Sequence, residues 1–366
     1  MKRFSTLLVI LLLFIPLLPY ARAVDVVAEQ SDALGTDELS RALPDEAGDI
    51  LGNLSVTDAM DAERGIEHLV SGVVSRLRGI FTGALRSAAA VVLAAMLSGL
   101  FAAAFPERNG NYATLAAVLA VSAISLASVN TFIGMSVGVL DDLETFSKML
   151  LPTLTAAATA SGALTSAGIR YAATVLFLDV LMSLMRSVIM PLIYAFAALS
   201  VAEAAVGGDA LAGAASLVKW LSKVLLSGFV LAFVAYVSLT GVIASAADAV
   251  AVRAAKVTIS TVLPVVGSIL ADAADTVLSG AALLRNAVGV FGLLAVAAVC
   301  AVPFLKLGAH YLLFKAAGGL SGAVADKRIT ALVNAFGAAF GMTLAMTGVA
   351  AMMLFVSIVA TIRVAA

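Results

Sequence analysis

Residues 286–307 read NAVGVFGLLAVAAVCAVPFLKL, a stretch whose only charged residue is Lys306. A helix needs about 20 such residues to cross the hydrocarbon of a bilayer. Over the whole chain of 366 residues, 62% are hydrophobic and 12% are charged, against roughly 45–50% and about 25% in soluble domains. So few charges could not cover the surface of a soluble protein of this size. The sequence therefore predicts an all-α, polytopic helical membrane protein.

Comparable apolar stretches follow one another from about residue 84 onward and predict about eight spans. Several are longer than about 25 residues, so tilted or kinked helices are expected. The acidic segment 141–148 becomes an outer loop in this scheme. The eight spans are expected near residues 84–105, 113–140, 149–168, 171–206, 220–247, 257–283, 286–307 and 329–361.

Basic residues favour one orientation of these spans. The loops on one side carry eight Lys and Arg residues, and the flanks on the other side carry five. Because cytoplasmic loops are enriched in Lys and Arg, the first set is expected in the cytoplasm. These loops are 106–112, 169–170, 248–256 and 306–328.

The N-terminal part of the chain differs from the rest. Residues 1–23 have the basic start, apolar stretch and small-residue cleavage site of a signal peptide, with an uncleaved anchor as the alternative. Residues 24–82 form an acidic segment, expected outside the cytoplasm, before a transmembrane domain at 83–366. From Thr57 to Phe81, apolar residues recur every three or four positions. This amphipathic helix suits either lipid or bundle packing, or docking of an outer partner.

Prolines and glycines indicate breaks and an internal repeat. Pro152 and Pro191 recur 112 residues later as Pro264 and Pro303. Two repeat units, 148–247 and 260–361, would each hold three crossings, so the second would be inverted as in many transporters. Chance similarity in an apolar sequence is the alternative. The four prolines, together with Gly267, are predicted to break or kink their helices.

Glycines four residues apart allow helices in lipid to approach closely. The sequence holds several such pairs, which predict close packing within the chain or between copies in a homo-oligomer. The pairs are Gly79/Gly83, Gly134/Gly138, Gly318/Gly322 and Gly337/Gly341.

Four ionisable residues fall inside predicted spans, where each costs about 2.5–3.5 kcal/mol on insertion scales. Asp179 and Arg186 are two helical turns apart, and Asp272 and Asp275 are three residues apart, so each pair shares a helix face. We expect these four residues to line a polar pathway. The alternatives are ion pairs that fix packing for the first pair, and an interfacial segment for the second.

The residues predict neither an enzyme nor a cofactor or metal site. A formal net charge of −1 argues against a nucleic-acid partner, and one Cys with two His cannot build a Cys/His zinc site. Residues 319–322 read GLSG, the Gly-x-Ser-Gly pattern of rhomboid proteases, but no histidine follows Ser321 to act as its base. No Walker-type nucleotide motif occurs, so nucleotide energy would need another subunit.

Several motifs in combination resemble the stage III sporulation protein AE family of endospore-forming bacteria. They are RALPDEA at 41–47, LLPTLTA at 150–156, ASGA at 160–163, KVTISTVLPVVGS at 256–268, DAADTVLSGA at 272–281 and RNAVGVFGLL at 285–294. The resemblance spans about residues 40–362.

The resemblance implies a multi-pass protein of the mother-cell membrane around the forespore. It implies a part in a transenvelope channel needed for late forespore development. The partners would be other stage III A-type proteins, a separate ATPase subunit and stage II sporulation protein Q. It implies no catalytic residues. A stand-alone secondary transporter and an architectural scaffold of the complex remain the alternatives.

Overall fold

The computed structural model describes residues 31–363 except 53, 57, 59–61, 105–109, 163–165, 207–208 and 263–266. Within 239–262 and 267–277 the helical backbone alone is described. The predicted signal peptide at 1–23 and Pro264 lie outside the described residues. The described part of the chain is helical and contains no strand, which confirms the all-α prediction.

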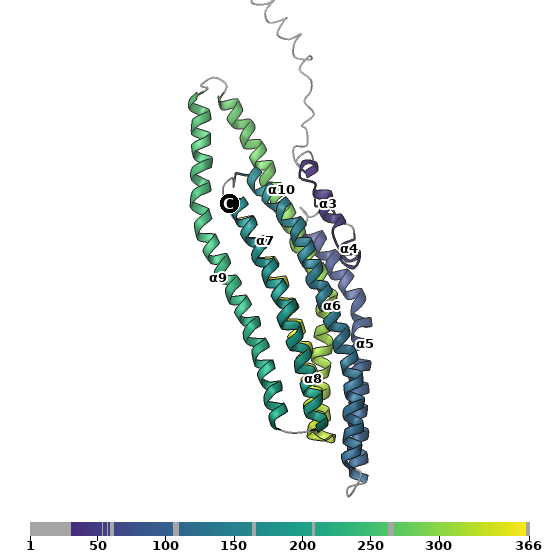
Figure 1. Cartoon of the computed structure of the whole chain (residues 1–366). Coiled ribbons are helices and arrows are strands. Elements are labelled where there is room, and N and C mark those ends of the chain that lie inside the picture. The colour runs from purple at the N-terminus through teal and green to yellow at the C-terminus, as the bar shows by residue number, and fades with distance from the viewer. Residues whose placement is uncertain are drawn as a thin grey trace, which may run out of the picture.

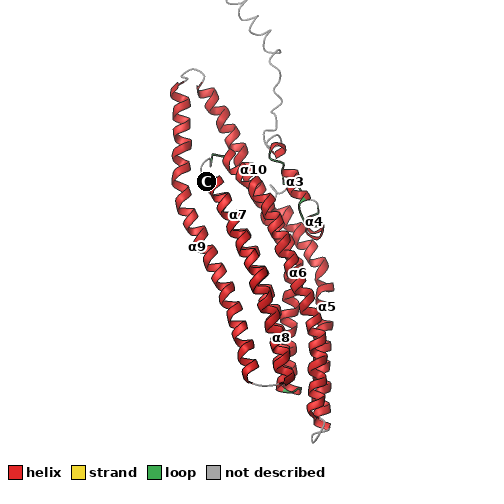
Figure 2. Cartoon of the chain, in the orientation of Figure 1, coloured by secondary structure: helices red, strands yellow, loops and turns green. Residues whose placement is uncertain are grey.

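Long helices run alternately up and down as one elongated bundle (Figure 1), and helix accounts for almost all of it (Figure 2). α7, the π-helix η3 and α8 together form one rod, and the short α3 and α4 precede the bundle. The helices are α3 Thr36–Arg41, α4 Asp45–Leu51, α5 Ala62–Ala104, α6 Gly110–Ala160, α7 Ser166–Leu184, η3 Met185–Ile189, α8 Met190–Val206, α9 Asp209–Val262, α10 Gly267–Val324 and α11 Lys327–Arg363.

Six rods in the described residues are long and apolar enough to cross a membrane, so the count of eight is not confirmed. Several predicted loops were wrong, and most of the predicted loop 306–328 belongs to α10, which ends at Val324. α6 is continuous through residues 141–148, and α10 is continuous through 283–286, where separate spans were expected to meet. The candidate spans are Ala62–Phe101, Thr114–Ala160, Tyr171–Val206, Ala210–Ser238, Leu278–Val324 and Lys327–Ile362.

An even number of rods places the start of α5 and the end of α11 at the same end of the bundle (Figure 1). Residues 169–170 and 248–256, expected as loops on the side of 306–328, instead lie within α7 and α9 near the opposite end. The expected repeat is not confirmed, and the proposed unit boundary at residue 148 falls inside α6. The expected domain boundary after residue 82 likewise falls inside α5.

The described prolines do not end their helices. α6 continues through Pro152 and α10 through Pro303. Pro191 is the second residue of α8 and follows η3 directly. A proline lacks an N–H and crowds the carbonyl four residues earlier, here that of Ser187 in η3. The wider π turn accommodates this crowding. Gly267 begins α10.

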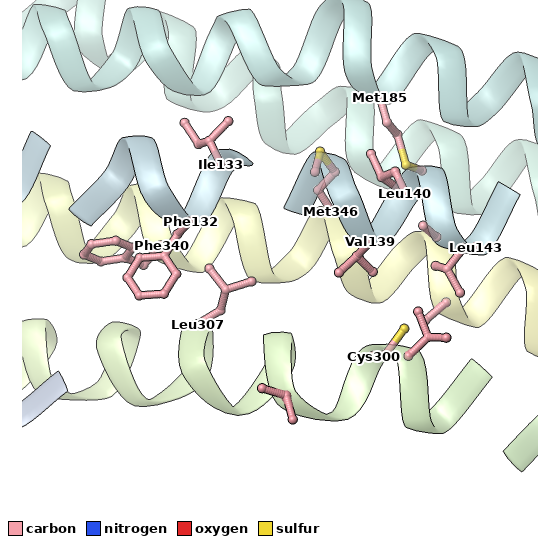
Figure 3. Close-up of a cluster of buried hydrophobic side chains, with 14 of the residues drawn as sticks. Phe132, Ile133, Val139, Leu140, Leu143, Met185, Cys300, Leu307, Phe340 and Met346 are labelled. Carbon is pink, nitrogen blue, oxygen red and sulfur yellow. The ribbon is translucent and has the colours of Figure 1, made fainter. Parts of the chain in front are cut away.

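The apolar core lies among α6, α10 and α11 (Figure 3), and α10 is the central helix. In the most apolar window of α10, 67% of residues are buried, against 17% in that of α9. Phe132 of α6 and Phe340 of α11 pack edge to face with ring centroids 5.5 Å apart. Leu307 of α10 lies beside them in the close-up. Most side chains of α10 in this window are therefore covered by other helices, whereas α9 lies at the periphery of the bundle.

The glycine pairs differ in what they approach. A Cβ on Gly341 would lie 3.0 Å from the ring of Tyr311, so this pair serves α10–α11 packing. Around Gly79, Gly83 and Gly134 nothing lies within 4 Å of such a Cβ. The close helix approach predicted from the glycine spacing therefore occurs between α10 and α11. It does not occur at these positions of α5 and α6.

Gly99 sits where α5 crosses the end of α10. A Cβ there would lie 1.9 Å from the carbonyl oxygen of Val324, a backbone atom that no rotamer change can move. We expect Gly99→Val to lower the free energy of unfolding by about 1–3 kcal/mol, the usual range for overpacking. Thermal unfolding of the detergent-purified protein measures this.

The matched control is Gly134→Val on α6, where a larger side chain meets open space. Its stability should stay within about 0.5 kcal/mol of the parent. Equal effects of the two substitutions would contradict the close approach of α5 to α10.

Candidate functional site

Five charged side chains from consecutive rods meet in one cluster, which we call the charge cluster. α6 supplies Asp141, Glu144 and Lys148, α7 supplies Asp179, and η3 supplies Arg186. The three α6 residues are spaced by three and four positions, which places them on one face of the helix. The seven-residue spacing of Asp179 and Arg186 does the same on the facing rod.

Because the two rods are antiparallel, the first residue of the cluster on α6 pairs with the last residue on the facing rod, and the last pairs with the first. Arg186 Nη2 lies 2.9 Å from Asp141 Oδ1 and also donates to Glu144 Oε2. Lys148 Nζ lies 3.3 Å from Asp179 Oδ1 and 2.5 Å from Glu144 Oε1. Glu144 therefore receives both cations and joins the two halves of the cluster.

A hydrogen bond continues the same register along α8. The hydroxyl of Tyr194 donates to Asn130 Oδ1 at 2.9 Å. Apolar side chains alone would pack nearly as well after a shift of one turn, whereas these polar contacts would be lost. The α6 interface with α7, η3 and α8 is thus specified by charge as well as by shape.

The charge cluster is open to its surroundings. The side chains of Lys148, Asp179 and Asp141 are 50%, 49% and 56% exposed, while that of Glu144 is 18% exposed. Charges at bilayer depth do not rest against acyl chains, because the free-energy cost is too high. The cluster therefore requires water, lipid headgroups or another protein beside it.

The second exposed feature is an apolar stripe on α5, formed by Ile66, Val70, Val74 and Phe81, which we call the α5 stripe. These side chains are 47–56% exposed. The amphipathic helix predicted for this region exists, but as the first turns of the long α5. The described residues leave the stripe exposed, so it is available to lipid or to a partner.

Ser321 of the Gly-x-Ser-Gly pattern also lies far from His310, the histidine that precedes it on α10. His310 Nδ1 contacts the Lys306 carbonyl oxygen at 2.8 Å, and its ring packs against Phe132. Ser321 follows eleven residues later on α10, about 17 Å along the helix axis. The two side chains cannot form a catalytic pair. Among the described residues, no group of three His, Cys, Asp or Glu side chains could hold a metal ion.

The sequence matches the family described as stage III sporulation protein AE over residues 55–365. The chain belongs to this family. It is 26% identical over 197 residues to the Stage III sporulation protein AE of Bacillus subtilis (strain 168). The match covers 54% of this chain and 49% of that relative, so it spans about half the length of the curated relative. No solved structure matches.

Family membership and the six apolar rods together identify a multi-pass membrane protein of sporulation. Of the four predicted pathway residues in this AE-family chain, the structure brings Asp179 and Arg186 into one cluster. Asp272 and Asp275 lie in the first turns of α10, and their side chains are outside the described residues. Their role in a pathway stays a prediction.

Sequence reasoning missed the α6 members of the charge cluster because it assigned residues 141–148 to a loop. The spacing of Asp141, Glu144 and Lys148 carried the missing signal. It has helical period and the same axial length as Asp179 to Arg186, with charges that pair when the helices run antiparallel. Two charged faces that complement each other in this way favour the prediction of a continuous helix through an acidic segment.

A double-mutant cycle on Lys148→Met and Asp179→Asn tests the cluster in the AE-family protein. Both side chains are half exposed, so we expect a coupling energy of about 0.5–1 kcal/mol, near the top of the range for exposed pairs. Chemical or thermal unfolding of the four purified proteins gives this value.

Lys148→Met combined with Glu203→Gln, at the far end of α8, is the control cycle. It should be additive within about 0.3–0.5 kcal/mol. The same coupling energy in both cycles would show that no specific pairing joins Lys148 to Asp179.

Proposed function

We propose that this chain is a non-enzymatic, membrane-embedded subunit of a sporulation transenvelope channel. It acts in the mother-cell membrane around the forespore, in a permease-like or export-gate-like role. Its partners are other stage III A-type proteins, a separate ATPase subunit and stage II sporulation protein Q. The observation that carries this proposal is the match to the stage III sporulation protein AE family over residues 55–365.

The charge cluster supports a role in transport beyond anchoring. A plain membrane anchor needs no five-residue ionic network between apolar rods, because each charge is costly at bilayer depth. The π-helix at Arg186 adds to this support, since π turns occur frequently at functional sites. In the proposed assembly the exposed side of the cluster faces a water-filled path or a partner subunit.

The proposed orientation places the acidic N-terminal segment outside the cytoplasm. The opposite end of the bundle carries Lys327 and Arg328 at the start of α11, which the positive-inside tendency favours in the cytoplasm, whereas Arg253 and Lys256 of α9 lie at the same end as the N-terminal segment. The α5 stripe then lies on the outer side of the membrane, where a partner on the forespore side can reach it.

Deletion of the gene in the organism that carries it tests the sporulation role. We expect the number of heat-resistant spores to fall to near zero, with late forespore transcription reduced. A copy expressed only in the mother cell should restore both, and a copy expressed only in the forespore should not. Normal spore counts, or rescue from the forespore alone, would refute the proposal.

Thiol labelling in intact cells separates the pathway from a purely architectural scaffold. On a Cys300→Ala background, Ser183→Cys places a thiol on the exposed side of α7, four residues from Asp179. A membrane-impermeant reagent should label it if water reaches the charge cluster. Leu231→Cys on α9 is the control, because this exposed position has apolar surroundings and should stay unlabelled.

The scaffold alternative predicts no labelling at either position. It also predicts normal sporulation when Asp179, Arg186, Asp272 and Asp275 are all replaced by neutral residues. A stand-alone transporter would instead move a solute in vesicles that contain this protein without partners. These outcomes differ, so the three functions are distinguishable.

A further inference from the structure

A cavity with a basic lining lies between α9 and the α10–α11 hairpin. It has a volume of about 440 Å³. Its polar lining consists of Lys219 and Lys223 of α9, Tyr311 and Lys315 of α10, and Asn334 of α11. No carboxylate contributes to the lining. All three helices bring these residues toward the end of the bundle where α10 joins α11 (Figure 1).

The three lysines lack counter-charges in the described part of the chain. None of them takes part in an ion pair there. Lys219 Nζ lies 5.6 Å from the centre of the Phe196 ring, which holds it without neutralising it. Three ammonium groups around one cavity repel each other, and an anion between them removes this repulsion. The cavity therefore has the chemistry of an anion site.

An apolar cavity of about 490 Å³ lies next to the basic one. Ala345 of α11 lines both cavities, so they adjoin at this residue, and we call the two together the α9 groove. The apolar part is lined by side chains such as Phe233 of α9, Phe304 of α10 and Met352 of α11. Val234 and Met352 are 52% and 65% exposed, so the groove is open along one side.

The apolar part has the depth of one leaflet. From Ala345 to Val356, both in its lining, α11 rises about 17 Å at 1.5 Å per residue. Half of the hydrocarbon core of a bilayer is about 15 Å. A molecule with an anionic head at the lysines and a hydrocarbon tail along α11 therefore matches the groove in charge, polarity and length.

We propose that the α9 groove binds one anionic phospholipid, with the phosphate among Lys219, Lys223 and Lys315 and an acyl chain against Phe304 and Met352. Basic pockets between transmembrane helices on the cytoplasmic side are suited to acidic headgroups, because that leaflet supplies anionic lipid. The bound lipid fills the space between peripheral α9 and the core hairpin. It thereby joins α9 to α10 and α11.

Thermal unfolding of the full-length protein in detergent tests the proposal with three probes. These are dioleoyl phosphatidylglycerol, dioleoyl phosphatidylcholine and inorganic phosphate. We expect phosphatidylglycerol to raise the melting temperature at concentrations at least tenfold below those at which phosphatidylcholine does. Inorganic phosphate should have no comparable effect, because it lacks the apolar part. Equal responses to the two lipids, or a full response to phosphate alone, would overturn the proposal.

Matched variants locate the site. Replacing Lys219, Lys223 and Lys315 with Gln should abolish the preference for phosphatidylglycerol, and replacing the same three residues with Arg should keep it. The control triple, Lys306→Gln, Lys327→Gln and Arg328→Gln, removes as many charges outside the cavity and should also keep it. The Arg triple separates a lost headgroup site from general misfolding.

The acyl-chain contact has its own variant. Ala345→Phe places a ring at the junction of the two cavities and should weaken the phosphatidylglycerol response at least tenfold. Native mass spectrometry should find one tightly held phosphatidylglycerol on the parent and none on the Gln triple. Lipid retained by the Gln triple, or a lipid-insensitive dimer that buries Lys315, would refute the proposal.

Discussion

Pairing of Arg186 with the acids of α6 is the interaction on which the arrangement of the middle rods depends. It fixes how far α6 slides along α7, η3 and α8, because its neighbouring ion pair and the Tyr194–Asn130 hydrogen bond require the same register. Loss of the guanidinium would leave Asp141 without a cation and Glu144 with Lys148 alone. Asp141 is 56% exposed and can be solvated, so the loss falls mainly on Glu144, whose side chain is 18% exposed.

The same constraint connects the bundle to the membrane. Helices are the natural spanning structure because their backbone groups are satisfied internally. Side-chain charge receives no such protection and must find partners or water. In this AE-family protein the charges are concentrated in a few places: the charge cluster on one side of the bundle, and the lysines of the α9 groove on another.

Composition and hydropathy were enough to predict the class of protein and the position of most apolar segments. Eight spans were predicted where the described residues form six rods, because hydropathy falls at charged residues, whereas a helix ends only where its backbone is interrupted. Residues 141–148 dip in hydropathy yet contain no helix-breaking residue, so α6 continues. Asp179 and Arg186 were identified from their cost in lipid. The three lysines of the α9 groove were not, because they come from helices far apart in sequence and meet only after folding.

Length is the feature of α10 with the widest consequence. Its 58 residues correspond to a rod of about 87 Å, about twice the 40–45 Å of a bilayer with its headgroups. A helix of these dimensions cannot be contained by one membrane, even when tilted. Roughly half of it must stand clear as a rigid post, braced by its neighbours. A protein attached to the tip of such a post would be held at a set height above the lipid surface.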